Sequence, residues 1–193
     1  VELNEYRRQI WGVSDEVIFA LGNVGNMLFN MGRFEEAVDA LNAVVLRMRE
    51  IGLSGRAIIG VLRGLMWALE AVGDEESARP VAQELLAIRE QCALSTDRDA
   101  YILNAYARDL LQAYPTDLRD PCKALEMALL AFEVSTEEYH YNRFTLGLAY
   151  EANGMLDEAA AMLCRALSHA PIEAGGSRNQ YESALIRVLE KSG

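Results

Sequence analysis

The chain has 193 residues, 51% of them hydrophobic, with 29 acidic and 18 basic side chains and a net charge of −11. This length fits one domain or a short repeat array, and the composition excludes an intrinsically disordered chain. The negative charge argues against nucleic acid and anionic membranes as partners, because phosphates are bound by basic surfaces. Ala and Leu together account for 53 residues, against 25 for Val, Ile and Thr, which favours helices over strands.

The cysteines and the apolar stretches indicate the compartment. The three cysteines are Cys92, Cys122 and Cys164. An odd number without a CxxC motif favours a reducing cytoplasm over a disulfide framework. The N-terminal residues lack the apolar core of a secretory signal, and the longest apolar stretch, residues 57–71, is short and contains Arg63 and Glu70. We therefore predict a cytoplasmic protein without a membrane span. The first residue, Val1, leaves open whether the chain is a segment of a longer protein.

An internal repeat organises the chain. The pattern of apolar and small residues in residues 21–45 returns in residues 62–86, at an offset of 41, and again from Leu146 onward. In chain order, we predict a leading helix over residues 1–12, four helical hairpins across residues 14–172 (14–52, 54–93, 96–135 and 136–170), and a last helix over residues 177–191. The two end helices are amphipathic and cap the predicted array, whose terminal core would otherwise face water.

The hairpins are marked by small residues and by helix caps. Gly32, Gly73 and Gly154 stand where a first helix must end, because glycine adopts the left-handed cap conformation without a Cβ penalty. Small residues also stand where two helices must approach closely: Gly25, Ala37, Ala78, Ala107, Ala124, Gly147 and Ala159. Helix starts are predicted at polar capping residues: Ser14, Ser54, Thr96, Asp120 and Thr136. Asp120 is followed by Pro121 at the first helical position.

This layout resembles the tetratricopeptide repeat. The fourth hairpin carries the family pattern best, through Leu146, Gly147, Tyr150, Gly154, Ala159, Leu163, Ala166 and Pro171. The repeat length is similar to that of the long variety in kinesin light chains and bacterial regulatory proteins. Residues 114–133 resemble a signature of repeat regions attached to bacterial serine/threonine kinases. The resemblance implies an all-α fold, a right-handed superhelix (α-solenoid) of about four hairpins with capping helices.

The sequence offers little for catalysis or for metal binding. His140 and His169 are the only histidines, whereas a structural zinc site needs four ligands. Residues 52–60 contain glycines but lack the Gly-Lys-Ser/Thr ending of a phosphate-binding loop. Free cysteines usually behave as small apolar residues. We therefore predict no catalytic residues, no metal site and no cofactor, and a protein that is not an enzyme.

The resemblance implies that the first helix of each hairpin lines a concave groove. The groove residues, read from the family register, are Asn23, Asn26, Phe29, Asn30, Arg63, Trp67, Glu70, Asn104, Arg108, Gln112, Tyr141, Phe144 and Glu151. Amides can hydrogen-bond a peptide backbone, and aromatic side chains anchor partners. We predict a protein–protein interaction module that binds an extended peptide or a partner helix, with Arg63 and Arg108 selecting an acidic or phosphorylated segment. The same residues also fit the ordinary surface and core of stacked helices.

Other functions stay open at this point. One is the sensory or scaffold arm of a larger bacterial signalling protein, such as a serine/threonine kinase. Another is a structural module that self-associates through its terminal helices. RNA binding is disfavoured by the acidic charge. The carboxylate clamp of chaperone-binding relatives is also disfavoured, because Asn26 alone matches its pattern, and Gly22 and Tyr101 stand at its lysine positions.

Overall fold

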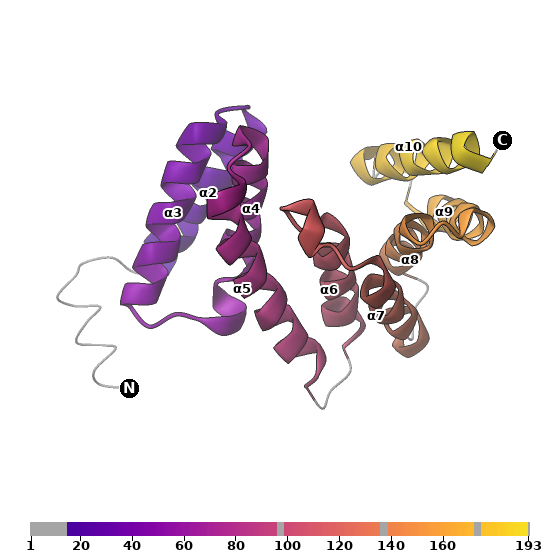
Figure 1. Cartoon of the computed structure of the whole chain (residues 1–193), viewed down its shortest axis with the longest axis horizontal. Helices are drawn as coiled ribbons and strands as arrows, with labels where there is room; N and C mark the ends of the chain where they lie inside the picture. Colours follow the sequence, from indigo (N-terminus) through magenta and orange to yellow (C-terminus); the bar gives the residue numbers. More distant parts are fainter. Residues whose placement is uncertain (1–14, 96–98, 136–138, 172–174, 193) are drawn as a thin grey trace. The chain divides into compact units, whose positions relative to one another are not determined.

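The computed structural model describes residues 15–95, 99–135, 139–171 and 175–192 (Figure 1). Within these residues it contains α-helices and two short 3₁₀ helices, and no strand, which confirms the predicted all-α fold. The α-helices are α2 (Asp15–Asn30), α3 (Phe34–Glu50), α4 (Ile59–Val72), α5 (Glu75–Ala93), α6 (Ala100–Gln112), α7 (Pro121–Val134), α8 (His140–Ala152), α9 (Leu156–His169) and α10 (Gly175–Ser192). The 3₁₀ helices are η1 (Gly55–Ala57) and η2 (Thr116–Leu118).

The chain divides into two compact units, each with its own core. Unit 1 comprises the described residues up to Ile88 together with Ala113–Leu118. Unit 2 comprises Arg89–Gln112 together with the residues from Arg119 onward. In unit 1, α2 packs against α3 and α3 against α4; in unit 2, α6 packs against α7, α7 against α8, α8 against α9 and α9 against α10. Helices that follow one another in sequence therefore pack together, as in stacked helical hairpins.

Aliphatic side chains of α3, α4 and α5 form the core of unit 1. Its largest fully buried members are Leu41, Met48, Ile58, Leu62, Leu65, Met66, Leu69 and Leu85. Gly25 of α2 faces this core, and a Cβ at this position would lie 2.5 Å from Cγ of Leu41. The close approach predicted at Gly25 is confirmed, because any larger side chain there would displace Leu41 from a closely packed interior.

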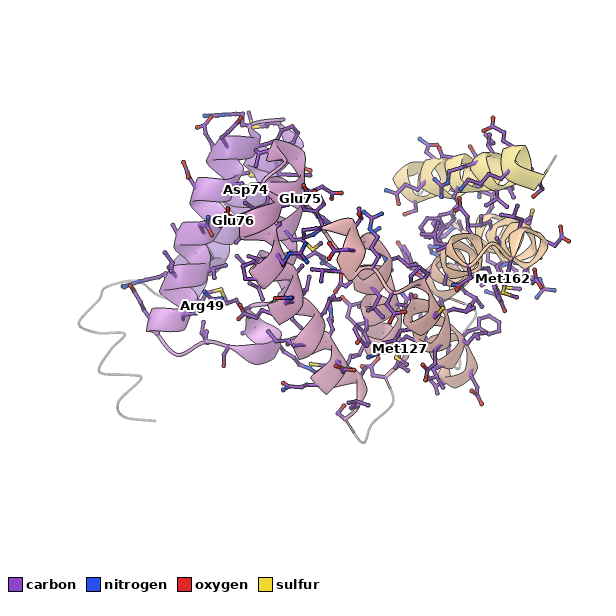
Figure 2. The ribbon with its side chains drawn as sticks, viewed as in Figure 1. Arg49, Asp74, Glu75, Glu76, Met127 and Met162 are labelled. Atoms are coloured by element: carbon purple, nitrogen blue, oxygen red, sulfur yellow. The ribbon has the colours of Figure 1, made fainter. Side chains whose placement is uncertain are left out.

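Small residues allow equally close packing in unit 2. Ala107, Ala124 and Ala159 are fully buried, as Ala37 and Ala78 are in unit 1. A Cβ at Gly147 of α8 would lie 2.8 Å from Cγ of Leu163 on α9. Two methionines, Met127 of α7 and Met162 of α9, pack against the edge of this core (Figure 2). The predicted small residues thus mark helix contacts in both units.

The first helices end as the glycines predict. Gly32, Gly73 and Gly154 have φ angles of +75°, +77° and +74°, in the left-handed region. The residue after each glycine donates its backbone N–H to the carbonyl oxygen five residues earlier, over 3.0 Å in each case. These bonds satisfy carbonyl groups that the end of a helix would otherwise leave without a donor.

Of the predicted helix starts, the structure confirms one and contradicts another. At α7, Oδ1 of Asp120 accepts the backbone N–H of Lys123 over 2.9 Å, and Pro121 is the first helical residue, as predicted. The prediction at Ser54 is wrong: the short η1 follows this residue, Ser54 makes no capping hydrogen bond, and α4 begins only at Ile59. The predicted leading helix, residues 1–12, and the predicted caps Ser14, Thr96 and Thr136 lie outside the described residues.

Two aspartates act as helix caps that the sequence analysis missed. Oδ1 of Asp74 accepts the backbone N–H of Ser77 over 3.0 Å at the start of α5. Glu75 and Glu76 follow in the first turn (Figure 2), where they favour the positive end of the helix dipole. Oδ1 of Asp99 accepts the backbone N–H of Tyr101 over 2.8 Å and starts α6 in the same way.

Candidate functional site

In unit 1, the predicted groove residues of α2 lie on one exposed helix face. Asn23, Asn26 and Asn30 follow one another at intervals of three and four residues, and all three are exposed. Oδ1 of Asn26 lies directly over Gly64 of α4, since a Cβ at Gly64 would come within 2.6 Å of this oxygen. Phe29, on the same helix, is half-buried, and its ring lies 5.3 Å from that of Phe34.

The predicted residues of α4 form a second part of this surface in unit 1. The guanidinium of Arg63 lies 5.4 Å from the centre of the Trp67 ring, one turn along the helix, which is a cation–π distance. Both side chains are half-buried, and Glu70 is exposed one turn further. Arg63 therefore stacks on an aromatic ring of its own helix, which fixes its charge in place at the surface.

In unit 2, three of the predicted residues come together in a pocket between α6 and the start of α8. The pocket has a volume of about 550 Å³. Its lining residues are Asp99, Ala100, Tyr101, Asn104, Arg108, Tyr139, Tyr141 and Asn142. Helical spacing explains the contribution of α6, because Tyr101, Asn104 and Arg108 are separated by three and four residues and share one face. Tyr141 is the predicted residue that α8 adds.

Asn104 gives this pocket an incomplete hydrogen-bonding network. The residue is only 8% exposed, and its Oδ1 has no hydrogen-bond donor among the described residues. A buried acceptor without a donor costs about 1–3 kcal/mol, so such atoms are rare in folded proteins. Rotation of the amide about χ2 exchanges its oxygen and nitrogen, which lets Asn104 offer either an acceptor or a donor to a bound group.

Three tyrosines surround the pocket and leave large parts of their rings in contact with solvent. Tyr101 is 77% exposed, Tyr139 is 51% exposed and Tyr141 is 48% exposed. Exposed tyrosines bring both apolar ring surface and a hydroxyl, a combination that is enriched where proteins bind partners. The sequence analysis named Tyr141 and missed the other two, of which Tyr101 stands one helical turn before Asn104.

Arg108 adds a positive charge to the lining of the pocket. It is half-buried, and none of the described carboxylates forms an ion pair with it. Its charge acts on the hydroxyl of Tyr181, whose pKa burial raises to about 12 and the Arg108 guanidinium lowers in part. Arg108 is therefore available to a carboxylate or a phosphate of a bound molecule.

The remaining predicted residues of unit 2 lie away from this pocket. The ring of Phe144 stacks on that of Tyr181, with 4.3 Å between the ring centres. Glu151 accepts hydrogen bonds from Nε and Nη2 of Arg187, over 2.7 and 2.6 Å, and from Nζ of Lys191 over 2.8 Å. These contacts fix α10 on α8, and the arginine lowers the pKa of the Glu151 carboxyl. Gln112 is half-buried at the end of α6.

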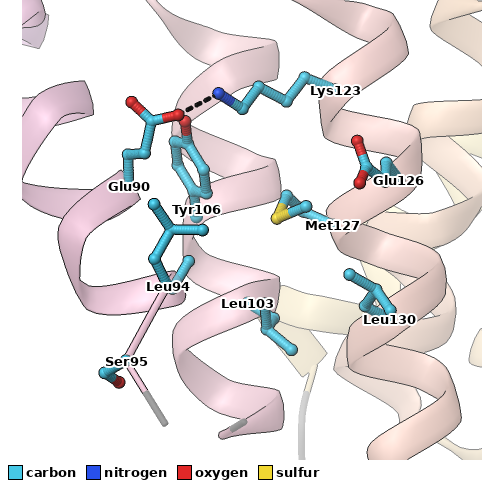
Figure 3. Close-up of a pocket in the computed structure, with 10 residues that line it drawn as sticks. Glu90, Leu94, Ser95, Leu103, Tyr106, Lys123, Glu126, Met127 and Leu130 are labelled. Atoms are coloured by element: carbon cyan, nitrogen blue, oxygen red, sulfur yellow. Dashed lines mark hydrogen bonds and ion pairs between the residues drawn. The ribbon is translucent and has the colours of Figure 1, made fainter.

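A second cavity, of about 410 Å³, lies between the end of α5, α6 and α7 (Figure 3). Lys123 pairs with Glu90 at one end of it and lies 5.6 Å from the centre of the Tyr106 ring. The hydrogen bond from Lys123 to Glu90 raises the pKa of the lysine well above its usual value. Below this pair, Leu94 and Met127 line the cavity (Figure 3). Because the lysine of this cavity is already paired with Glu90, the pocket between α6 and α8 is the better candidate for specific binding.

Two features are absent from the part of the chain that the structure describes: a cluster of metal-ligating side chains and a membrane-spanning helix. No group of three or more His, Cys, Asp or Glu side chains is placed there to hold a metal ion. None of the described helices is both long and apolar enough to cross a membrane.

Comparison with known proteins identifies the repeat. A family model for the tetratricopeptide repeat matches residues 20–47 and 141–172, that is most of α2 and α3, and nearly all of α8 with α9. Nearly identical TPR-like repeats of a candidate kinesin light chain from Podosopora anserina align with a TM-score of 0.61 and 20% identity, over 91% of this chain and 87% of that chain.

Two further solved structures share the fold. A thermophilic TPR protein of Thermus thermophilus aligns with a TM-score of 0.56 and 21% identity, over 96% of this chain and 88% of that chain. BtubC from P. vanneervenii aligns with a TM-score of 0.55 and 18% identity, over 96% of this chain and 85% of that chain. No curated protein matches the sequence. The repeat layout, the helix pairs and these matches agree: residues 20–47 and 141–172 match the tetratricopeptide repeat, and the chain has the fold of tetratricopeptide repeat proteins.

Proposed function

We propose that this chain is a non-catalytic protein-interaction module that holds an extended peptide segment in the pocket between α6 and α8. The observation that carries the proposal is Asn104, a buried amide with an unsatisfied oxygen inside a pocket of exposed tyrosines. A peptide backbone presents N–H and C=O groups in alternation. It therefore supplies the donor that Asn104 lacks and the acceptor that the other end of the amide can use.

An extended segment fits this pocket better than a partner helix does. A helix satisfies its own backbone groups and would leave Oδ1 of Asn104 without a donor. The pocket volume of about 550 Å³ falls in the range of small-ligand sites, which suits a few residues rather than a whole helix.

In this proposal, Arg108 selects an acidic or phosphorylated segment. A guanidinium pairs with a carboxylate or phosphate through two parallel hydrogen bonds. Arg63 plays the corresponding part on the surface of unit 1, beside Trp67 and the asparagines of α2. That surface is the second place where we expect peptide contacts, with Asn23, Asn26 and Asn30 as its amide groups.

The experiment is an affinity selection from a random peptide library with the folded protein. The enriched peptides are then titrated against Asn104→Ala and Arg108→Ala by fluorescence anisotropy. Asn42→Ala is the matched control, because it removes an exposed amide of α3 that lies outside both proposed contact surfaces. We expect each pocket variant to weaken binding about tenfold, in line with the loss of one hydrogen-bonding partner. Equal binding by the pocket variants and the wild type would refute the pocket as the site.

Self-association is a second candidate function with an observation of its own. On α10, Ile186 and Leu189 are 57% and 55% exposed and lie one turn apart on the same face. A second copy of the chain would bury this apolar face. Sedimentation velocity over a range of concentrations tests this, with Ile186→Glu as the variant that should abolish any dimer. The role as an arm of a larger bacterial signalling protein stays a prediction.

A further inference from the structure

The charges at the two ends of the pocket point to a particular kind of peptide. We infer that the bound segment carries a basic side chain beside Asp99 and an acidic or phosphorylated side chain beside Arg108, about four residues apart. This inference rests on the proposed function and adds a charge pattern and a spacing to it. It concerns side chains of unit 2 alone, which lie on α6 and α8 or directly before them.

The spacing follows from the geometry of α6. Asp99 caps the helix and Arg108 lies nine positions later, so the two residues are separated by about 13 Å along the helix axis. Both line the same pocket. An extended chain advances by about 3.3–3.6 Å per residue, so about four residues cover this distance.

Both charges are available to a bound molecule. Asp99 is exposed, and its capping bond to the N–H of Tyr101 uses one of the several acceptor positions of the carboxylate. Arg108 is half-buried and forms no ion pair with a described residue. The pocket therefore presents a negative end at the start of α6 and a positive end near its last turn.

The middle of the pocket is uncharged, which limits the pattern to its two ends. Asn104 stands between Asp99 and Arg108 on α6 and would bind the peptide backbone. Tyr139, which precedes α8, and Tyr141 and Asn142 of α8 complete the lining. Complementary charges contribute more to selectivity than to affinity, because a peptide with like charges at the wrong end is repelled. We therefore expect an oppositely charged pair to be preferred over two acids or two bases.

The test uses fluorescein-labelled octapeptides that share one sequence from the library selection and differ at two positions four residues apart. The pairs are Lys with Glu, Lys with phosphoserine, Glu with Glu, Lys with Lys, and Gln with Gln. A further peptide carries Lys and Glu at adjacent positions. The oppositely charged pairs are made in both orders, because an extended peptide can bind in either direction. The affinity of each peptide is measured by anisotropy at low and at high salt.

Two variants remove one charge each with little structural change. Asp99→Asn keeps a good capping residue, and Arg108→Gln keeps a long polar side chain. Asp120→Asn is the control for the first, because it removes a capping carboxylate of unit 2 outside the pocket. Arg165→Gln is the control for the second, since Arg165 is exposed on α9. Circular dichroism of each variant verifies that its helices are retained.

The inference predicts that the Lys–Glu or Lys–phosphoserine peptide binds wild type about tenfold tighter than the Glu–Glu and Lys–Lys peptides. In Asp99→Asn, the oppositely charged peptides should no longer bind more tightly than the Glu–Glu peptide. In Arg108→Gln, they should no longer bind more tightly than the Lys–Lys peptide. Equal affinity for all pairs, with binding still dependent on Asn104, would overturn the inference and leave the proposed function standing. Tightest binding by Glu–Glu would overturn it in favour of a purely anion-selective site. If no peptide binds, the proposed function itself fails.

Discussion

The buried ion pair between Arg89 and Asp109 allows a quantitative test of what holds unit 2 together. Nε of Arg89, near the end of α5, donates to Oδ2 of Asp109 on α6 over 2.6 Å. The two side chains are only 9% and 1% exposed. Removing one partner of such a pair leaves an uncompensated charge in the interior, which costs about 3–5 kcal/mol. Asp109→Ala should therefore lower the free energy of unfolding by this amount, a large part of the stability of a typical domain.

Replacing both partners should have a much smaller effect. Desolvation of two charges offsets most of their attraction, so apolar residues of similar volume often stabilise a protein as well as a buried pair does. The double variant Arg89→Met with Asp109→Leu should therefore recover most of the stability that Asp109→Ala loses. The difference between the single and the double variants separates the cost of an orphaned charge from the net contribution of the pair.

Urea unfolding followed by far-UV circular dichroism measures these changes. Repeat proteins can unfold in more than one step, so the slope of each transition is compared as well as its midpoint. The control is the surface pair of Arg79 with Asp117, which are 42% and 62% exposed. Asp117→Ala should leave the midpoint unchanged within error, because exposed pairs contribute little. A loss below about 1 kcal/mol in Asp109→Ala would refute the reasoning, since that is the range of solvated pairs.

Three further predictions concern single residues. Gly154→Ala should lower the free energy of unfolding in urea by about 1–2 kcal/mol because its φ is +74°, whereas Gly60→Ala, in open space on α4, should be neutral or stabilising. Tyr181→Ala should cost about 3–5 kcal/mol and Tyr181→Phe about 1 kcal/mol in the same assay, since its ring is buried and its hydroxyl lies 2.8 Å from Nδ1 of His140. Burial lowers the pKa of His140 below its ordinary 6.5, so the unfolded state binds more protons as pH falls through that value. The unfolding midpoint should then decrease below about pH 6.5, and His140→Gln should remove this decrease.

Local and short-range features of the fold could be predicted from the sequence. Gly32, Gly73 and Gly154 could be predicted because the left-handed conformation at a helix end disfavours residues that have a Cβ atom. Gly25 and Gly147 were identified because the repeat places them where two helices touch. Asp99 was missed because Thr96, three residues earlier, is also a capping type, and only the position of the first helical residue shows that Asp99 caps α6.

Contacts between distant residues could not be predicted in the same way. Arg89 and Asp109 are twenty positions apart, and nothing in either local pattern indicates that they meet. In the candidate site, the register identified Asn104, Arg108 and Tyr141, because helical spacing alone places residues on a face. It did not identify Tyr139, which precedes α8 and follows no helical spacing.

Helix α8 shows why a register alone overstates a binding surface. Tyr141, Phe144 and Glu151 share one face of this helix by spacing, yet they have different surroundings. Phe144 and Glu151 contact Tyr181, Arg187 and Lys191 of α10, so the last helix covers this part of the face. Tyr141, at the first turn, stays 48% exposed and lines the pocket. The face of α8 is thus divided between α10 and the pocket, and only the docking of α10 determines where the division falls.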